Sequence, residues 1–214
     1  VVIDCANGAG YRAAPEVLWE LGAEVVPVGV SPDGRNINLE CGSTSPRIAA
    51  ETVVAHGADV AICLDGDADR VLVIDEQGCP IDGDHFLGMI GSRWQKEGIL
   101  VEKTLVATVM SNMHLETFLN REGIKLVRTA VGDRYVVEQM RLNGFNLGGE
   151  KSGHVVMTDY STTGDGLMAG LQFLAEMVRR GEPASAVGRP FDLAPQKTEN
   201  IIYASEKNPL DNPS

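Results

Sequence analysis

The sequence predicts an α/β protein made of two domains with mixed or mainly parallel sheets. Two observations carry this prediction: apolar strand-like runs alternate with amphipathic helix-like segments from the first residue onward, and 214 residues suffice for two domains of ordinary size. A polar stretch, RWQKEGILVEK at 93–103, interrupts the alternation near its middle. We therefore expect domains at 1–98 and 99–190, followed by a linker segment at 191–214.

The first half contains four predicted strands and three predicted helices. The strands are the apolar runs at 1–6, 23–30, 58–64 and 70–78. Each helix ends at a glycine, the residue that most readily adopts the left-handed conformation after a last turn: Gly22, Gly57 and Gly98. Ser45, followed by Pro46, has the pattern of an N-cap before the first helical residue, so we expect the second helix to begin there.

The second half repeats this rhythm. Its predicted strands are 104–110, 124–131 and 154–159, and its predicted helices are 113–123, 133–144 and 165–180. Asn112 and Asp165 are candidate N-caps for the first and the last of these helices. The final segment contains the strand-like run TENIIYA at 198–204. Because the chain opens on a strand without an initiator Met and closes shortly after this run, we expect a fragment of a longer protein.

The charge and the cysteines limit the partners and the compartment. A net charge of −12 argues against nucleic acid and anionic membranes as partners, and the apolar runs are too short to span a bilayer. A phosphorylated ligand stays compatible with this charge, because a few cations and backbone amides suffice to bind one phosphate. The four cysteines are widely spaced and lack a C-x-x-C pattern, so we expect reduced thiols and a cytoplasmic protein.

The stretch CLDGDADRVLVID places three aspartates on alternating positions between two strand-like runs. Asp65 follows the first run, Asp67 and Asp69 come after it in a tight turn, and Arg70 stands next to the last aspartate. Ligands of open α/β sheets collect at the carboxyl ends of strands, which is where this turn is expected. Three carboxylates converging there repel one another unless a hard cation such as Mg²⁺ neutralises them. The alternative is a solvated acidic turn.

Three kinds of site compete for this turn. An EF-hand loop requires glycine at its sixth position, where this chain has Arg70, and a helix rather than a strand pattern after it, so that interpretation fails. An enzyme with an aspartyl-phosphate intermediate would use Asp65 as its nucleophile, but it leaves the third aspartate and the arginine unexplained. In the third interpretation all three aspartates bind the metal and Arg70 contacts a phosphate that completes its coordination.

The sequence resembles the α-D-phosphohexomutase family. DGDADR matches the metal loop D-G-D-[GA]-D-R of that family, and GEKSGH at 149–154 is similar to its sugar-binding loop G-E-x-S-G-H. DCANGAG, VMSNM, VGDRYV and TTGDGLMAGLQ occur in the order found in the branch that acts on glucosamine phosphates. VMSNM and VGDRYV favour that branch over the one that acts on mannose and glucose phosphates.

The resemblance implies the second and third of four domains, each with three layers and a mixed sheet, and the start of a fourth domain within 191–214. The phosphoserine loop of the first domain and the phosphate-binding loop of the fourth have no counterpart in this chain. The full enzyme would interconvert glucosamine 6-phosphate and glucosamine 1-phosphate through a bisphosphorylated intermediate. The isolated chain would then be inactive, and the missing first and fourth domains would be its partners.

The resemblance also implies roles for individual residues. Mg²⁺ would be held by Asp65, Asp67 and Asp69, with Arg70 stabilising the phosphoryl group. Glu150 and Ser152 would bind sugar hydroxyls, and His154 would shuttle a proton or bind the substrate.

Other residues are expected nearer the edge of the site. Lys151 is either a sugar contact or a solvated charge. The loop of Gly132, Asp133 and Arg134 would border the phosphosugar substrate, although Asp133 is also suited to cap the next helix and Arg134 to lie on the surface.

Three alternatives remain open from the sequence. The nearest is a sibling mutase acting on mannose or glucose phosphates. A weaker one is a phosphatase with Asp65 as its nucleophile. The third belongs to another class: a non-catalytic module that binds Mg²⁺ or a phosphosugar.

Overall fold

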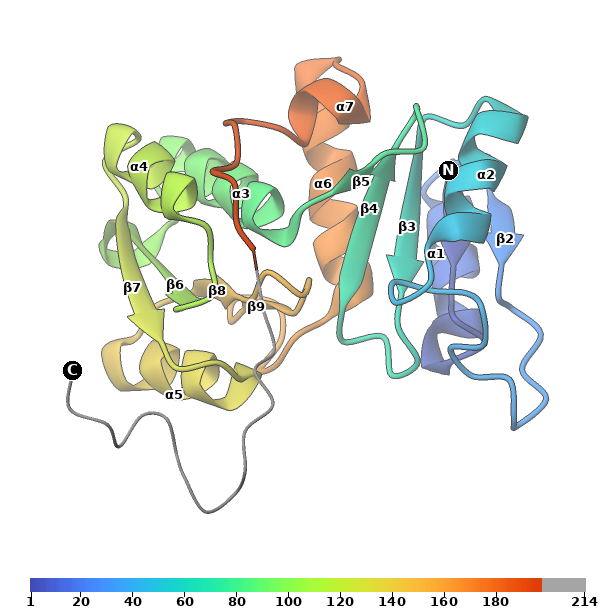
Figure 1. The fold of residues 1–214 in the computed structure, drawn as a ribbon, viewed down its shortest axis with the longest axis horizontal. Helices are drawn as coiled ribbons and strands as arrows, with labels where there is room; N and C mark the ends of the chain where they lie inside the picture. Colours follow the sequence, from blue (N-terminus) through green and yellow to red (C-terminus); the bar gives the residue numbers. More distant parts are fainter. Residues whose placement is uncertain (198–214) are drawn as a thin grey trace.

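The computed structural model describes residues 1–197 and contains two sheets with helices on both faces of each (Figure 1). The first sheet has the order β2-β1-β3-β4-β5, in which β1 is parallel to β2 and β3 and the last two strands are antiparallel to their neighbours. Its strands are β1 (Val2–Asp4), β2 (Val26–Val28), β3 (Val60–Leu64), β4 (Val71–Asp75) and β5 (Pro80–Ile81).

The second sheet has the order β7-β6-β8-β9, in which β6 is parallel to β7 and β8 and β9 is antiparallel to β8. Its strands are β6 (Thr104–Thr108), β7 (Lys125–Thr129), β8 (Leu147–Gly149) and β9 (Val155–Met157). Both sheets are therefore mixed. Short 3₁₀ turns at Ala9–Tyr11 and Val101–Lys103 and the short helix α7 (Ala184–Val187) complete the regular structure of residues 1–197.

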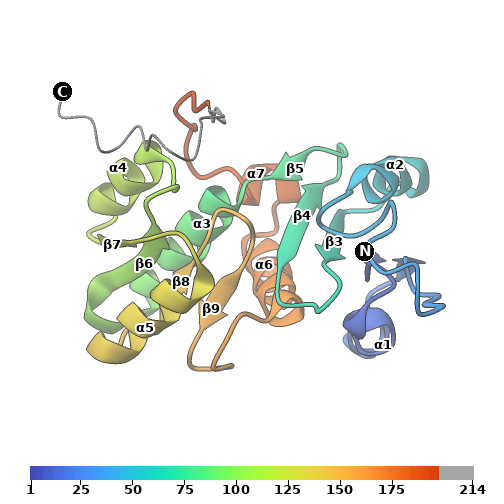
Figure 2. The ribbon, with the colours of Figure 1, turned by 60° about the horizontal axis from the view of Figure 1, so that its bottom comes forward.

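Helices cover each sheet on both faces, which makes each unit three layers thick (Figure 2). Helix α2 (Arg47–His56) packs on one face of the first sheet, while α1 (Ala13–Glu20) and α6 (Gly166–Arg180) pack on the other. Helix α5 (Asp133–Asn143) packs on one face of the second sheet, and α3 (Gly83–Glu97) and α4 (Met113–Arg121) pack on the other. The fold class predicted from the sequence is confirmed.

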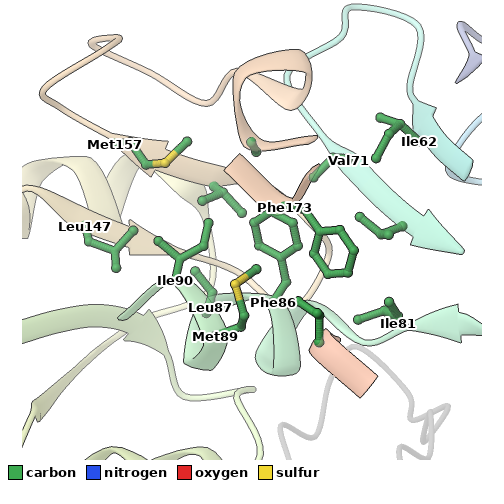
Figure 3. Packing of buried hydrophobic residues seen from close by; sticks show 14 of the residues in the cluster. Ile62, Val71, Ile81, Phe86, Leu87, Met89, Ile90, Leu147, Met157 and Phe173 are labelled. Carbon is green, nitrogen blue, oxygen red and sulfur yellow. The ribbon is translucent and has the colours of Figure 1, made fainter. Parts of the chain in front are cut away.

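The largest apolar cluster lies between the two sheets and includes residues of both. Phe86 of α3 stacks on Phe173 of α6 with ring centroids 5.9 Å apart, and Figure 3 shows these rings between Ile62 and Val71 of the first sheet and Leu147 and Met157 of the second. Since α6 follows the second sheet in sequence but covers the first, the units share one buried interior rather than meeting at a hydrated interface.

The domain boundary expected between residues 98 and 99 differs from the structure. The first sheet ends at Ile81, and α3, which follows it, packs against α4 and β8 of the second unit. Trp94 lies in the polar stretch that we interpreted as the boundary between the domains, yet it is completely buried. The polar residues at the start of that stretch belong to the exposed end of α3, and such a helix end has the composition of a segment between domains.

Local predictions are confirmed at several helix ends and fail elsewhere. Asn112 and Asp165 cap their helices by accepting hydrogen bonds from His114 N and Met168 N. Ser45 does not cap α2: the N-cap is Pro46, with no side-chain bond. Strand β8 is not among the strands predicted from the sequence. The expected strand at 198–204 lies outside the described residues.

The cysteines and the helices agree with a reduced protein without a membrane span in the part described. Cys5, Cys41 and Cys63 are buried free thiols, and burial raises the pKa of Cys5 to about 12. Among residues 1–197 we find no helix with the length and apolarity to cross a bilayer.

Candidate metal and sugar site

The three aspartates lie in the turn that joins β3 to β4. Strand β3 is buried along its whole length and delivers Asp65 at its carboxyl end. Neighbouring loops fix the backbone of the turn: Ala9 N donates to Gly66 O at 2.8 Å, and Ser43 N donates to Leu64 O at 2.9 Å. Ala68 has a left-handed backbone, with φ of 62°, which turns the chain back toward β4.

The carboxylates converge as expected for a cation site. Ligand oxygens of Asp65, Asp67 and Asp69 lie within 4.8 Å of one another. Asp65 is buried and its Oδ1 accepts a hydrogen bond from Arg70 N at 3.1 Å. Burial raises the pKa of Asp65, and the neighbouring charges of Asp69 and Asp67 raise it further.

One oxygen of the group has no hydrogen-bond donor. Asp69 Oδ1 is buried and accepts no hydrogen bond from the described residues. A buried carboxylate oxygen that accepts no hydrogen bond, beside two further carboxylates, is costly in a protein interior, whereas a hard cation that prefers oxygen ligands would satisfy all three groups. The donor set therefore fits Mg²⁺.

Arg70 has the position expected of a group that contacts an anion at the metal. Its Nε lies 3.7 Å from Asp65 Oδ2 and 3.9 Å from Asp69 Oδ1. Its side chain is 47% exposed, so the guanidinium borders solvent while staying next to the carboxylates. Such a fork of N–H donors suits a phosphoryl group bound beside the cation.

The loop GEKSGH joins β8 to β9 and pairs directly with the metal loop. Val71 N donates to Gly153 O at 3.1 Å, and Arg70 and His154 form an isolated antiparallel bridge. Only glycine fits at position 153, because φ is +90° there and a Cβ would lie 2.1 Å from Val71 O. The two sequence motifs, 84 positions apart at their first residues (149 against 65), thus form one continuous backbone structure.

His154 faces the metal loop rather than solvent. Its Nδ1 lies 3.2 Å from Asp69 Oδ2, and its side chain is 3% exposed. Its Nε2 is buried without a hydrogen-bond partner and faces Gly164, where a Cβ would lie 2.6 Å from this nitrogen. Because a carboxylate only accepts, the contact requires the proton on Nδ1. This geometry supports a role in holding Asp69, in addition to the proton shuttle or substrate contact expected from the sequence.

The other residues of the sugar loop have different surroundings. Glu150 Oε1 accepts a hydrogen bond from Gly132 N at 3.0 Å, which brings the 132–134 loop to the site. Lys151 Nζ lies 3.3 Å from Asp82 Oδ2 and donates to Gln196 Oε1 at 3.1 Å. Ser152 is exposed.

Asp133 and Arg134 are both exposed. The N-cap of α5 is Gly132 and not Asp133, which stands at the first helical position. The guanidinium of Arg134 lies 4.9 Å from the centre of the Tyr135 ring. Both side chains are therefore available at the rim of the site.

Asp4 and Asp82 support the site, and sequence reasoning gave neither a role. Asp4 is fully buried and accepts hydrogen bonds from Ala6 N at 2.9 Å and Gly42 N at 2.7 Å, which ties together the loops that border the metal turn. Burial raises the pKa of Asp4. The sequence feature that could have identified Asp4 is a single aspartate at the end of an apolar run, as in VVIDCA.

Family models match nearly all of the described chain. Residues 1–78 match "Phosphoglucomutase/phosphomannomutase, alpha/beta/alpha domain II", and residues 82–190 match domain III of the same description. The gap between the matches falls at β5, in agreement with the end of the first sheet.

Curated relatives are similar over the whole chain. It is 65% identical over 214 residues to a phosphoglucosamine mutase of Cereibacter sphaeroides and 67% identical over 211 residues to one of Ruegeria sp.. These alignments cover 100% and 99% of this chain but 48% and 47% of the relatives. The chain therefore spans about half the length of the curated relatives it matches.

Solved structures share the fold. A phosphoglucomutase/phosphomannomutase family protein from Burkholderia thailandensis superimposes with a TM-score of 0.79 over 87% of this chain and 41% of its own, at 24% identity. An Aspergillus fumigatus N-acetylphosphoglucosamine mutase, solved with GlcNAc-6P and magnesium, gives a TM-score of 0.67 over 87% of this chain and 48% of its own, at 20% identity. With two consecutive family models covering both sheets and the loops between them, the chain belongs to the phosphoglucomutase/phosphomannomutase family.

Proposed function

We propose that the longer protein to which this chain corresponds is a phosphoglucosamine mutase. It would interconvert glucosamine 6-phosphate and glucosamine 1-phosphate through a phosphoserine and a bisphosphorylated intermediate, for the synthesis of UDP-N-acetylglucosamine. The observation that carries the proposal is the direct pairing of the acidic metal loop with the sugar loop, in a chain 65% identical along its length to a relative of that name. The reaction would take place in the cytoplasm.

The aspartates at 65, 67 and 69 would hold Mg²⁺ as the cofactor. When bound, the ion would neutralise charge on the transferring phosphoryl group, which is the main requirement of phosphoryl transfer. His154 would donate from Nδ1 to Asp69 Oδ2 and so leave Oδ1 for the metal. Arg70 would contact the same phosphoryl group from the exposed side.

The sugar would be bound by the second unit. The hydrogen bond from Gly132 N to Oε1 fixes the orientation of the Glu150 carboxylate. Its other oxygen, Oε2, would then be the one that binds the sugar. Exposed Ser152 would add a hydroxyl, and Lys151 would reach the phosphosugar only by leaving Asp82 and Gln196. The rim residues Asp133 and Arg134 would distinguish one sugar from another.

The remaining parts of the site would come from the rest of the protein. A first domain would supply the phosphoserine and a fourth domain a phosphate-binding loop, so the 214-residue chain alone is expected to bind metal without catalysing the reaction. The net charge of −12 supports a small phosphorylated substrate over nucleic acid or an anionic membrane as the partner.

A substrate panel tests the reaction. The full-length enzyme is assayed with glucosamine 6-phosphate, glucose 6-phosphate and mannose 6-phosphate. We expect kcat/KM to be highest for glucosamine 6-phosphate by at least about tenfold, or about 1.4 kcal/mol in transition-state binding. A preference for glucose or mannose phosphate would identify the sibling mutase instead, and absence of turnover with all three would favour a binding module.

A metal titration tests the ligands in this chain. Mn²⁺ binding, followed by electron paramagnetic resonance, is expected to weaken by at least about tenfold in Asp67→Ala, because one of three charged ligands is lost. Glu138→Ala removes an exposed carboxylate of α5 and serves as the matched control. Unchanged affinity in Asp67→Ala would refute the ligand assignment.

A further inference from the structure

The connection between β9 and α6 is a third loop at the metal turn. It contains the stretch TTGDG at 162–166, to which the proposed function gives no role. Gly164 forms an isolated antiparallel bridge with Val156 of β9. Gly166, the first residue of α6, donates a hydrogen bond from its N–H to Ala68 O at 2.9 Å. The loop therefore belongs to the second unit but bonds the metal turn of the first.

Both glycines of this loop stand where a side chain has no room. A Cβ at Gly164 would lie 2.8 Å from Asp69 O, and a Cβ at Gly166 would lie 2.3 Å from Arg70 O. Neither glycine has a positive φ, so the backbone conformation does not require glycine at these positions. The requirement is close approach to the backbone of the metal turn, and it extends over three successive residues when the bond to Ala68 is included.

Gly164 also packs against the imidazole of His154. A Cβ at Gly164 would lie 2.6 Å from both Nε2 and Cε1 of this ring, while the ring's Nδ1 lies 3.2 Å from Asp69 Oδ2. The ring is 3% exposed, so it cannot turn into solvent to make room. A methyl group at position 164 would therefore move the imidazole relative to the carboxylate that it contacts.

The first turn of α6 does not depend on the bond to the metal turn. Its cap is local, because Asp165 Oδ1 accepts a hydrogen bond from Met168 N at 2.8 Å. The N–H of a first helical residue has no acceptor within its own helix, which leaves Gly166 N available to another segment. The bond from Gly166 to Ala68 is therefore additional to the helix, and what it holds is the metal turn.

Two backbone bonds flank the residues that face the metal and the phosphoryl group. The bond at Ala68 precedes Asp69 and Arg70, and the bond at Val71 follows them. The first comes from the loop at 162–166 and the second from the sugar loop, so both come from the second unit. The backbone that carries these two side chains is thus held on each side by a part of the chain that belongs to the other sheet.

We propose that the loop at 162–166 positions the metal site, with Gly164 and Gly166 as positioning residues for Asp69 and Arg70. The backbone bond to the turn fixes the directions in which these two side chains leave it. The lack of side chains at the two glycines lets the loop come close enough to form that bond. This positioning role rests on the proposed binding of a cation by the aspartates, and the following measurements test the two separately.

Titration of the full-length protein with Mn²⁺ tests the role of Gly166. Gly166→Ala should weaken Mn²⁺ binding by at least about tenfold, because the turn that carries a ligand is displaced. Gly170→Ala is the matched control: it lies one turn further along α6, where a Cβ would lie 2.8 Å from the Ile62 side chain instead of the metal turn. It should leave the Mn²⁺ affinity within about twofold of wild type, whatever its effect on the Tm. Unchanged affinity in Gly166→Ala, or equal losses in the two variants, would overturn the positioning role. A wild-type protein that binds no Mn²⁺ would refute the proposed metal site itself, and the positioning role with it.

Hydrogen exchange of the wild-type protein, resolved at single amides, decides the matter if Gly166→Ala does not fold. Mg²⁺ should slow exchange of the Gly166 N–H by at least about threefold, because metal binding and the bond to Ala68 stabilise the same turn and each must strengthen the other. The Met168 N–H, which bonds Asp165 within the cap, is the internal control and should exchange at the same rate with and without Mg²⁺. Bound Mg²⁺ that leaves exchange at Gly166 unchanged, or that slows both amides equally, would overturn the positioning role.

Discussion

His154 and Asp69 link the two sequence motifs at the residue scale. The imidazole contributes no charge of its own when neutral, yet its contact with Oδ2 fixes which carboxylate oxygen remains for a metal. A hydrogen bond donated to a metal-binding side chain orients that ligand, and its loss commonly weakens metal affinity by about 10- to 100-fold. The role of His154 in orienting Asp69 can therefore be tested separately from a role in proton transfer.

Two substitutions of His154 separate these roles. An asparagine amide can occupy the place of Nδ1, whereas a glutamine amide mimics Nε2. We expect His154→Asn to retain most of the Mn²⁺ affinity of the chain and His154→Gln to lose about tenfold, as measured by calorimetry. Equal losses in both variants would contradict donation from Nδ1.

Asp84 offers a pH-dependent test of a second buried carboxylate. It is fully buried in the first turn of α3, its Oδ2 accepts from Asn112 N at 2.7 Å, and burial raises its pKa. The native state then binds a proton more tightly than the unfolded state. Wild-type stability contributed by Asp84 therefore rises as the pH falls from above the raised pKa toward the ordinary value.

Asp84→Asn removes this charge while keeping an oxygen acceptor. The free energy of unfolding of the variant relative to wild type should be most favourable at pH 7 and should decline on acidification. Urea titrations at pH 7, 5 and 4 measure the difference, in which the other buried carboxylates cancel because both proteins contain them. A difference that grows on acidification would contradict the expected sign.

At the scale of elements, the site depends on two loops that share a backbone pairing. Gly153 is the position where the loops approach most closely, and its backbone is also left-handed. Gly144, at the end of α5, has a similar φ of +71° but open space around it. Substitution at either glycine would strain a left-handed backbone, but only substitution at Gly153 would also create a steric clash. Comparing the two positions therefore distinguishes these effects.

Gly153→Ala should destabilise the protein by at least about 2 kcal/mol more than Gly144→Ala. Both variants strain a left-handed residue by about 1–2 kcal/mol, but only the first forces a methyl group onto Val71 O. Chemical denaturation of the two variants gives the comparison. Equal losses would show that the loops separate freely.

Sequence patterns predict elements well where local chemistry decides them. The glycine helix ends and the caps at Asn112 and Asp165 follow from local hydrogen bonding, and the buried runs at β3 and β6 follow from apolar content. Strand β8 was missed because LGG has the composition of a turn and becomes a strand only through its neighbours β6 and β9.

The sequence motifs predicted which residues form the candidate site, but not how those residues contact one another. The acidic triad and the sugar loop were found by motif, whereas the contact of His154 with Asp69 depends on strand pairing between units that no local pattern reveals. The boundary failed for a related reason: Trp94 stands among polar residues and is buried only because α3 packs under the second sheet.

At the scale of the whole molecule, α6 crosses from the second unit to cover the first. Gly170 allows this approach, because a Cβ there would lie 2.8 Å from Ile62. Helix α3 lies beside α6, so the inner helices belong to both units at once (Figure 1). A shared interior of this kind predicts that the two sheets unfold together.

Phe173→Ala tests this cooperativity. Loss of a fully buried ring that stacks on Phe86 should cost about 3–5 kcal/mol and lower the Tm while leaving a single transition. Calorimetry and circular dichroism should give the same midpoint. Two resolved transitions, with only one shifted, would show instead that the units unfold independently.

The main-chain bond between Val71 and Gly153 also constrains how relatives of this protein diverge. Because the bond uses backbone atoms, it places no demand of its own on the side chain at position 71, but inserting or deleting one residue in either loop would move the partner out of register. Substitutions can therefore accumulate around the two loops while their lengths stay coupled. Compensating changes in length, one in each loop, are the kind of paired event that such an arrangement requires.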